Sequence, residues 1–97
     1  MLYTINKAPL SSNSLSSVLR IAPTGAPLLL YEDGVYAAVP RASSSAMVEN
    51  ALSDHAIYAL DADLEARGID SVITGIQVIS YEGFVELVEQ HDVAPWL

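Results

Sequence analysis

Cysteine is missing from this 97-residue sequence. A chain without thiols cannot form a disulfide framework, a thiolate zinc site or an iron–sulfur cluster. It also has no cysteine nucleophile. These classes of site are therefore excluded before any pattern in the sequence is considered.

Basic residues are scarce as well: four Lys and Arg stand against twelve Asp and Glu, for a net charge of −8. Nucleic acids and anionic membranes are bound by positive patches, so this balance disfavours both as direct partners. No apolar run approaches bilayer-spanning length, and Met1–Tyr3 lacks the basic segment of a secretory leader. We expect a cytoplasmic protein with no membrane contact.

Apolar residues, by contrast, are abundant: 52% of the sequence is hydrophobic and only 16% is charged. The length predicts a single domain spanning residues 1–97. Small domains have much surface for their volume, so part of this apolar material is expected on the outside, in an oligomer interface. A small domain with a very apolar core is the alternative.

The stretch Leu28–Val39 decides the fold prediction. Its first apolar run ends at Glu32-Asp33-Gly34, after which a second apolar run begins. An unbroken apolar run predicts a strand that is buried on both faces. Asp-Gly between two such runs favours a β-hairpin. The alternative is a strand-to-helix turn in which Asp33 caps and Gly34 supplies an unusual backbone angle.

Apolar runs alternate with helical patterns along the rest of the chain. Strands are predicted at Leu2–Ile5, Leu28–Tyr31, Ala56–Leu60 and Ile76–Ile79. Helices are predicted after Asn13 as N-cap, over Ser45–Ser53, from Asp61 as cap to Arg67 with Gly68 in a left-handed conformation, and after Ser80 as cap. A tail, Val93–Leu97, closes the chain.

This alternation predicts an α/β fold: a mainly parallel sheet of four to five strands with helices on both faces. A parallel sheet needs long crossover connections, and residues 35–53 supply one between the second and third strands. The alternation therefore lowers the weight of the hairpin at Asp33-Gly34.

Few residues suggest catalysis. His55 follows Asp54 and His91 precedes Asp92, but triads are defined by geometry and not by adjacency in sequence. We interpret both histidines as solvated loop or helix-end residues. Glu89, near His91 and Asp92, completes no recognised metal-ligand spacing. The serines lie in no nucleophile motif, and phosphate-binding loops are absent from the sequence.

Four acidic residues define an alternative function. Glu32, Asp33, Asp61 and Asp63 follow the second and third predicted strands, and ligand sites of open α/β sheets lie at the carboxyl ends of strands. They could form a receiver-like, magnesium-binding pocket. Against this, Asp33 and Asp61 already have roles as turn and cap residues.

Six segments, taken in order, resemble the TusB/DsrH family. They are Met1–Lys7, Asn13–Leu15, Leu28–Val35, Ile57–Gly68, Tyr81–Val85 and the near-terminal Trp96. No single segment is chemically diagnostic, but their order and spacing together are fairly specific. The resemblance extends from the first residue to the last, and it implies the fold of the DsrE, DsrF and DsrH proteins.

The resemblance implies a subunit of a sulfur-relay complex. Its expected partners are a TusC/DsrF-like and a TusD/DsrE-like subunit of similar fold, in a heterohexamer. The TusBCD version passes persulfide sulfur toward thiolation of the tRNA wobble uridine, and the DsrEFH version serves sulfur oxidation. Both pathways stay open here. The tRNA would be reached only through the complex.

One departure from the family matters. Many DsrH-type members carry a cysteine in the first helix, and the resemblance places Val18 at that position. A sulfur carrier needs a thiolate, which neither valine nor the thioethers of Met1 and Met47 can replace. The chain is therefore expected to be an accessory subunit without catalytic residues, cofactor or metal, closer to TusB than to DsrH.

The partner surface is predicted from apolar residues that the core does not need. Aromatic side chains dominate interface energetics. Val35, Tyr36 and Trp96 are therefore the candidates for partner binding. Their alternative role is ordinary core packing.

Overall fold

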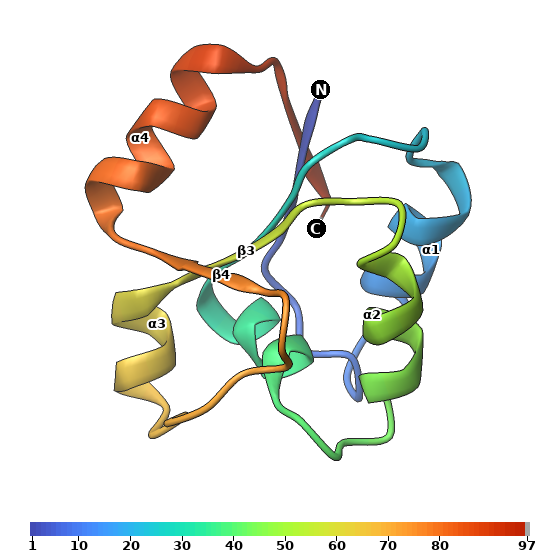
Figure 1. Cartoon of the computed structure of the whole chain (residues 1–97), viewed down its shortest axis with the longest axis vertical. Helices are drawn as coiled ribbons and strands as arrows, with labels where there is room; N and C mark the ends of the chain where they lie inside the picture. Colours follow the sequence, from blue (N-terminus) through green and yellow to red (C-terminus); the bar gives the residue numbers. More distant parts are fainter. Residues whose placement is uncertain (97) are drawn as a thin grey trace.

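The computed structural model describes residues 1–96, which form a five-stranded sheet with helices on both sides (Figure 1). The strands are β1 (Leu2–Ile5), β2 (Leu28–Leu30), β3 (Ile57–Leu60), β4 (Gln77–Ile79) and β5 (Val93–Trp96). Their order is β4-β3-β2-β1-β5, and all neighbours are parallel. The predicted fold class is confirmed.

The fifth strand corrects the prediction of a C-terminal tail. Val93–Trp96 pairs with the whole of β1, with Leu2 opposite Val93 and Ile5 opposite Trp96. The segment contains Pro95, which cannot donate to a ladder, and proline is tolerated on edge strands such as β5. Leu97, the last residue of the predicted tail, lies outside the described residues.

Five helical segments connect the strands. They are α1 (Ser14–Ile21), the 3-10 helix η1 (Glu32–Ala38), α2 (Ser45–Ala51), α3 (Asp61–Ala66) and α4 (Tyr81–Gln90). The hairpin prediction for Asp33-Gly34 is wrong, because this dipeptide lies inside η1. The strand-to-helix alternative holds with two changes. Glu32 has the left-handed backbone, with φ 48°, and not Gly34. The N-cap position is Tyr31 and not Asp33, which lies inside η1.

The topology decides which face each helix covers. The chain moves from β1 to β4 across the sheet and then returns through α4 to the far side of β1. Right-handed crossovers that move in opposite directions lie on opposite faces. Figure 1 accordingly shows α4 on one side of the sheet and α1, η1 and α2 on the other.

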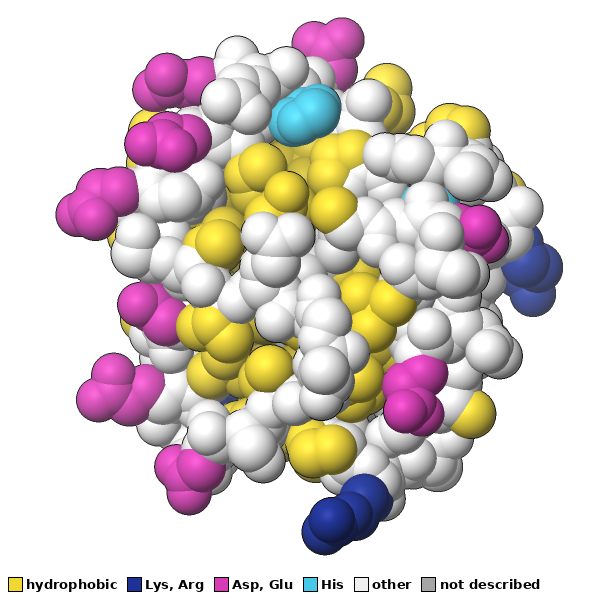
Figure 2. All heavy atoms as spheres, viewed as in Figure 1, with side chains coloured by type: hydrophobic (Ala, Val, Ile, Leu, Met, Phe, Trp, Pro, Cys, Tyr) yellow, Lys and Arg dark blue, Asp and Glu magenta, His cyan; other side chains and the backbone are white. Residues whose placement is uncertain are grey.

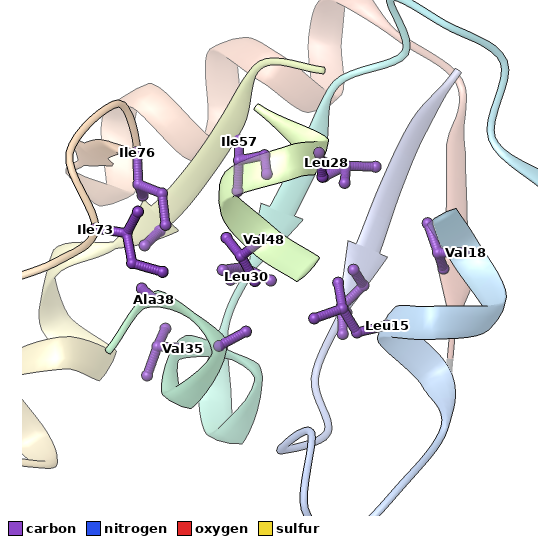
Figure 3. Packing of buried hydrophobic residues seen from close by; sticks show 14 of the residues in the cluster. Leu15, Val18, Leu28, Leu30, Val35, Ala38, Val48, Ile57, Ile73 and Ile76 are labelled. Atoms are coloured by element: carbon purple, nitrogen blue, oxygen red, sulfur yellow. The ribbon is translucent and has the colours of Figure 1, made fainter. Parts of the chain in front are cut away.

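The larger core lies on the α1–η1–α2 face. Register partners in adjacent strands, such as Ile5, Leu30 and Ala59, point into it and are almost completely buried. Val18 of α1 and Val48 of α2 cover these strands from outside (Figure 3). The smaller cluster on the other face has Leu2, Leu29 and Leu87 at its centre.

The helix ends test the predicted caps. Ser80 is confirmed as the cap of α4: its Oγ accepts a hydrogen bond from the Gly83 N–H at 3.3 Å. Gly68 is confirmed after α3, with φ 67°. Asn13 occupies the N-cap position of α1 but makes no side-chain cap bond. Asp61 is the first residue of α3 and not its cap, which is Leu60.

Within residues 1–96, none of the helices combines the length and the apolar character needed to cross a membrane.

Candidate partner-binding surface

The candidate surface is built around η1, at the carboxyl end of the sheet. The chain leaves β2 and turns sharply at Glu32, whose backbone N–H donates to Asp63 Oδ2 of α3 at 2.7 Å. That carboxylate satisfies a donor at the start of the helix, as a capping side chain would. A residue from a distant element therefore fixes the place where η1 begins.

Arg67 completes this connection. Its guanidinium lies 2.9 Å from Asp33 Oδ1 and 3.7 Å from Asp63 Oδ1. The Arg67 Nε also donates to Asp33 Oδ1 at 3.0 Å. One arginine at the end of α3 therefore neutralises two of the four carboxylates that the sequence grouped together.

The structure contradicts the alternative of a receiver-like magnesium pocket. In the part of the chain that the structure describes, no three His, Asp or Glu side chains are placed to hold a metal ion. Asp33 and Asp63 bind Arg67, while the Asp61 Oδ1 accepts from the N–H of Ala62 at 2.7 Å. The cluster fastens η1 to α3.

Gly34 sets how closely η1 lies against β1. It is buried, and a Cβ added there would overlap the carbonyl oxygen of Ile5. Only glycine allows this approach of two backbones. Val35 and Ala38 then face the core (Figure 3), and they and Ala37 have no exposed surface. Tyr36, 41% exposed, is left pointing outward.

Tyr36 is one wall of an apolar groove of about 460 Å³. The opposite walls are two connecting segments. The groove is lined by Ala8, Pro9, Leu10, Tyr36, Val39, Ala42, Ser43 and Ser44. Both segments lie at the lower end of the molecule in Figure 1, beside η1. The groove therefore lies between the segment that leads from β1 to α1 and the segment that leads from η1 to α2.

The three predicted interface residues have different environments. Val35 has 0% exposure and offers no surface to a partner, so for it the alternative of core packing applies. Tyr36 is exposed beside the groove. Trp96 is half-buried on β5, with its ring centroid 6.3 Å from that of Tyr3. A partner contact at Tyr36 or Trp96 stays a prediction.

Val18 lies in the core at 0% exposure. It points from α1 toward the strands, beside Leu15 (Figure 3). A cysteine at this position would be shielded from solvent, whereas reactive cysteines are at least partly exposed. The face of α1 that meets solvent carries other residues, including the exposed Arg20.

His55 corrects the interpretation of the histidines as solvated. It is buried, at 8% exposure, and its Nδ1 lies 2.8 Å from the carbonyl oxygen of Ala26. Because a carbonyl can only accept, Nδ1 is the protonated nitrogen of this contact. His55 therefore ties the start of β3 to that of β2. His91 follows α4 and is half-buried.

Two features of this surface were missed in the sequence. Arg67, the residue that ends α3, follows Asp63 by four positions, and this spacing of a helical ion pair could have revealed the contact. Leu10 stands alone between Pro9 and a polar serine-rich loop, and an isolated leucine in such a loop is the signal for an exposed apolar residue.

Comparison with known proteins identifies relatives over almost the whole chain. A family described as "DsrH like protein" matches residues 7–94. A protein named TusB from Serratia proteamaculans is 40% identical over 92 residues, covering 94% of each chain. A protein of the same name from Sodalis glossinidius is 38% identical over 91 residues, covering 93% of each.

Solved structures share the fold at low sequence identity. The YchN protein of Escherichia coli superposes with a TM-score of 0.85 at 20% identity, covering 97% of this chain and 96% of that one. Protein MTH1491 of Methanobacterium thermoautotrophicum gives a TM-score of 0.71 at 18% identity, with the same coverage. These likenesses concern the fold alone.

Proposed function

Because the chain belongs to the TusB/DsrH family, we propose that it is a non-catalytic subunit of a TusBCD-type sulfur-relay complex that supports thiolation of the tRNA wobble uridine. The family predicted from the sequence is confirmed by the match to residues 7–94 and by relatives at 38–40% identity. The pathway and the assembly are the proposed part.

The absence of cysteine carries the proposal. The domain has the fold and the family of sulfur-relay subunits but none of the thiols that persulfide transfer requires. Its contribution would be to bind and orient sibling subunits, one of which holds the reactive cysteine. A net charge of −8 also disfavours direct binding of tRNA, so the siblings would contact the RNA.

The assembly is tested by co-expression. The chain is produced with the DsrE-like and DsrF-like proteins of its own organism, and the mass of the purified assembly is measured by native mass spectrometry. We expect a heterohexamer containing all three chains. A preparation in which this chain stays a separate monomer would contradict the subunit role.

The pathway is tested in the cell. Deleting the gene is expected to lower the 2-thiouridine content of tRNA, measured by liquid chromatography and mass spectrometry, and a plasmid copy restores it. Unchanged thiolation with impaired growth on reduced sulfur would instead place the complex in sulfur oxidation. Covalent uptake of labelled sulfane sulfur by the purified chain alone would refute its non-catalytic role.

A further inference from the structure

We propose that the groove beside Tyr36 is the docking site for an acidic segment of a sibling subunit that inserts an apolar side chain. This inference rests on the proposed subunit role. It goes further by naming the binding surface and the chemistry of the segment that binds there. We call this surface the Leu10 groove. The Leu10 groove comprises Ala8, Pro9, Leu10, Tyr36, Val39, Ala42, Ser43 and Ser44.

Leu10 indicates that the occupant is a macromolecule. Its side chain is 90% exposed, more than any other large hydrophobic side chain in residues 1–96. A small ligand held in the groove would leave most of Leu10 in water. A polypeptide surface can cover Leu10 and fill the groove together, which removes both apolar surfaces from water at once.

The two connecting segments that flank Tyr36 are each held by hydrogen bonds. In the first, the backbone N–H and the Oγ of Ser11 both donate to the carbonyl oxygen of Ala8 at 3.1 Å, which closes a turn with Leu10 near its apex. Leu10 is therefore presented to solvent by a hydrogen-bonded turn. A surface that is ordered before binding loses less conformational freedom when a partner docks.

The second segment is held by the buried Ser45. Its Oγ accepts from the Ala42 N–H at 2.8 Å and donates to the Val39 carbonyl at 3.1 Å. These bonds close the loop around Arg41, whose backbone is left-handed with φ 62°. Non-glycine residues rarely adopt this conformation without a compensating constraint, and here Ser45 supplies it.

Charge identifies the occupant as acidic. Lys7 and Arg41, both exposed, immediately precede the two wall segments, and none of the lining residues is acidic. Neither forms an ion pair within residues 1–96, although Arg41 also borders a hollow that contains Glu49. Lys7 and Arg41 are thus the exposed chain neighbours of two residues that line the groove, Ala8 and Ala42. Complementary charge at the rim of the groove favours an acidic partner.

The rest of the molecule has the opposite character. All twelve acidic residues follow Tyr31 in the sequence. In Figure 2 most visible carboxylates lie along the side formed by α4 and α3, while the protruding basic side chains lie at the other side and at the lower end. An acidic segment would be repelled by the α3–α4 side and attracted to the Leu10 groove.

The test measures binding of the immobilised chain to the purified DsrE-like and DsrF-like pair by biolayer interferometry. Leu10→Asp is expected to weaken binding at least about tenfold, as loss of a central apolar contact does. The double variant K7E/R41E should bind several-fold more weakly and with less dependence on salt. Ile21→Asp is the matched control: Ile21 is 54% exposed on α1, and this variant should bind normally.

Each other outcome has a definite meaning. Normal binding by both Leu10→Asp and Tyr36→Ala would overturn the groove proposal while leaving the subunit role intact. No binding by the wild-type chain would refute the subunit role and this proposal with it. A dimer of the chain alone in sedimentation, abolished by Leu10→Asp, would assign the groove to a second copy and overturn the sibling assignment.

Discussion

The two faces of the sheet are covered unequally. On one face α1, η1, α2 and α3 bury a continuous cluster that contains most of the core. On the other, α4 alone covers a cluster with three buried members in residues 1–96: Leu2, Leu29 and Leu87. Hydrophobic burial is the main source of stability, so the first face should hold the fold together and α4 should be the first element to loosen.

The largest effect on stability is expected on the face covered by α1, η1, α2 and α3, the four-element face. Leu30 is 1% exposed at the centre of the sheet, and Leu30→Ala should cost about 3–4 kcal/mol of unfolding free energy through lost burial and a residual cavity. Urea denaturation followed by circular dichroism measures it. Leu10→Ala makes the same chemical change at 90% exposure and should stay within about 0.5 kcal/mol of wild type.

On the face covered by α4, a Leu→Ala substitution should lower the free energy of unfolding by less. Leu87 is 9% exposed in a cluster with one helix as cover, so Leu87→Ala should cost about 2 kcal/mol, the lower end of the range for buried leucine. Hydrogen exchange should show the α4 amides opening faster while those of β2 stay protected. Equal losses for Leu30→Ala and Leu87→Ala would show that the two faces contribute alike.

Most of this architecture could be predicted because it depends on local pattern. The strand Leu2–Ile5 was placed without error, and β2, β3 and β4 within one residue, since each is an apolar run between turn residues. The strand β5 was missed because Pro95 argues against a strand unless the position is known to be an edge.

The candidate surface was harder to predict, because its contacts join distant residues. The start of η1 depends on Asp63, thirty-one residues away, and its seat against β1 depends on the Ile5 carbonyl beside Gly34. Only the folded structure therefore shows that Tyr36 is exposed while its neighbour Val35 is turned into the core. Periodicity in a seven-residue 3-10 helix was too short to separate these two neighbours.

A smaller effect is expected at the cap of α4. Ser80→Ala removes the hydrogen bond to the Gly83 N–H, and loss of such a cap should cost about 1 kcal/mol. Ser44→Ala is the control, because Ser44 is at the N-cap of α2 but makes no side-chain cap bond. Thermal unfolding should separate the two variants, and identical melting temperatures would show that the Ser80 bond contributes nothing.

The smallest effect on stability is expected for the ion pairs on the face covered by α1, η1, α2 and α3. Arg67→Met removes the ion pairs to Asp33 and Asp63 that join α3 to η1. Asp33 is 61% exposed, so solvent screens this pair and the loss should be about 0.5 kcal/mol. Methionine keeps much of the aliphatic stem, so the change reports mainly on charge.

Salt separates this contribution from the general effect of removing a positive charge. In 1 M NaCl the difference between Arg67→Met and wild type in urea denaturation should shrink, because the Debye length falls to about 3 Å. Lys7→Met lowers the net charge equally without breaking an ion pair within residues 1–96. If both variants lose the same stability at low salt, self-repulsion of the acidic chain and not the α3–η1 connection is responsible. If only Arg67→Met lowers the free energy of unfolding, the ion pairs between α3 and η1 help to hold η1 against the face with the larger core.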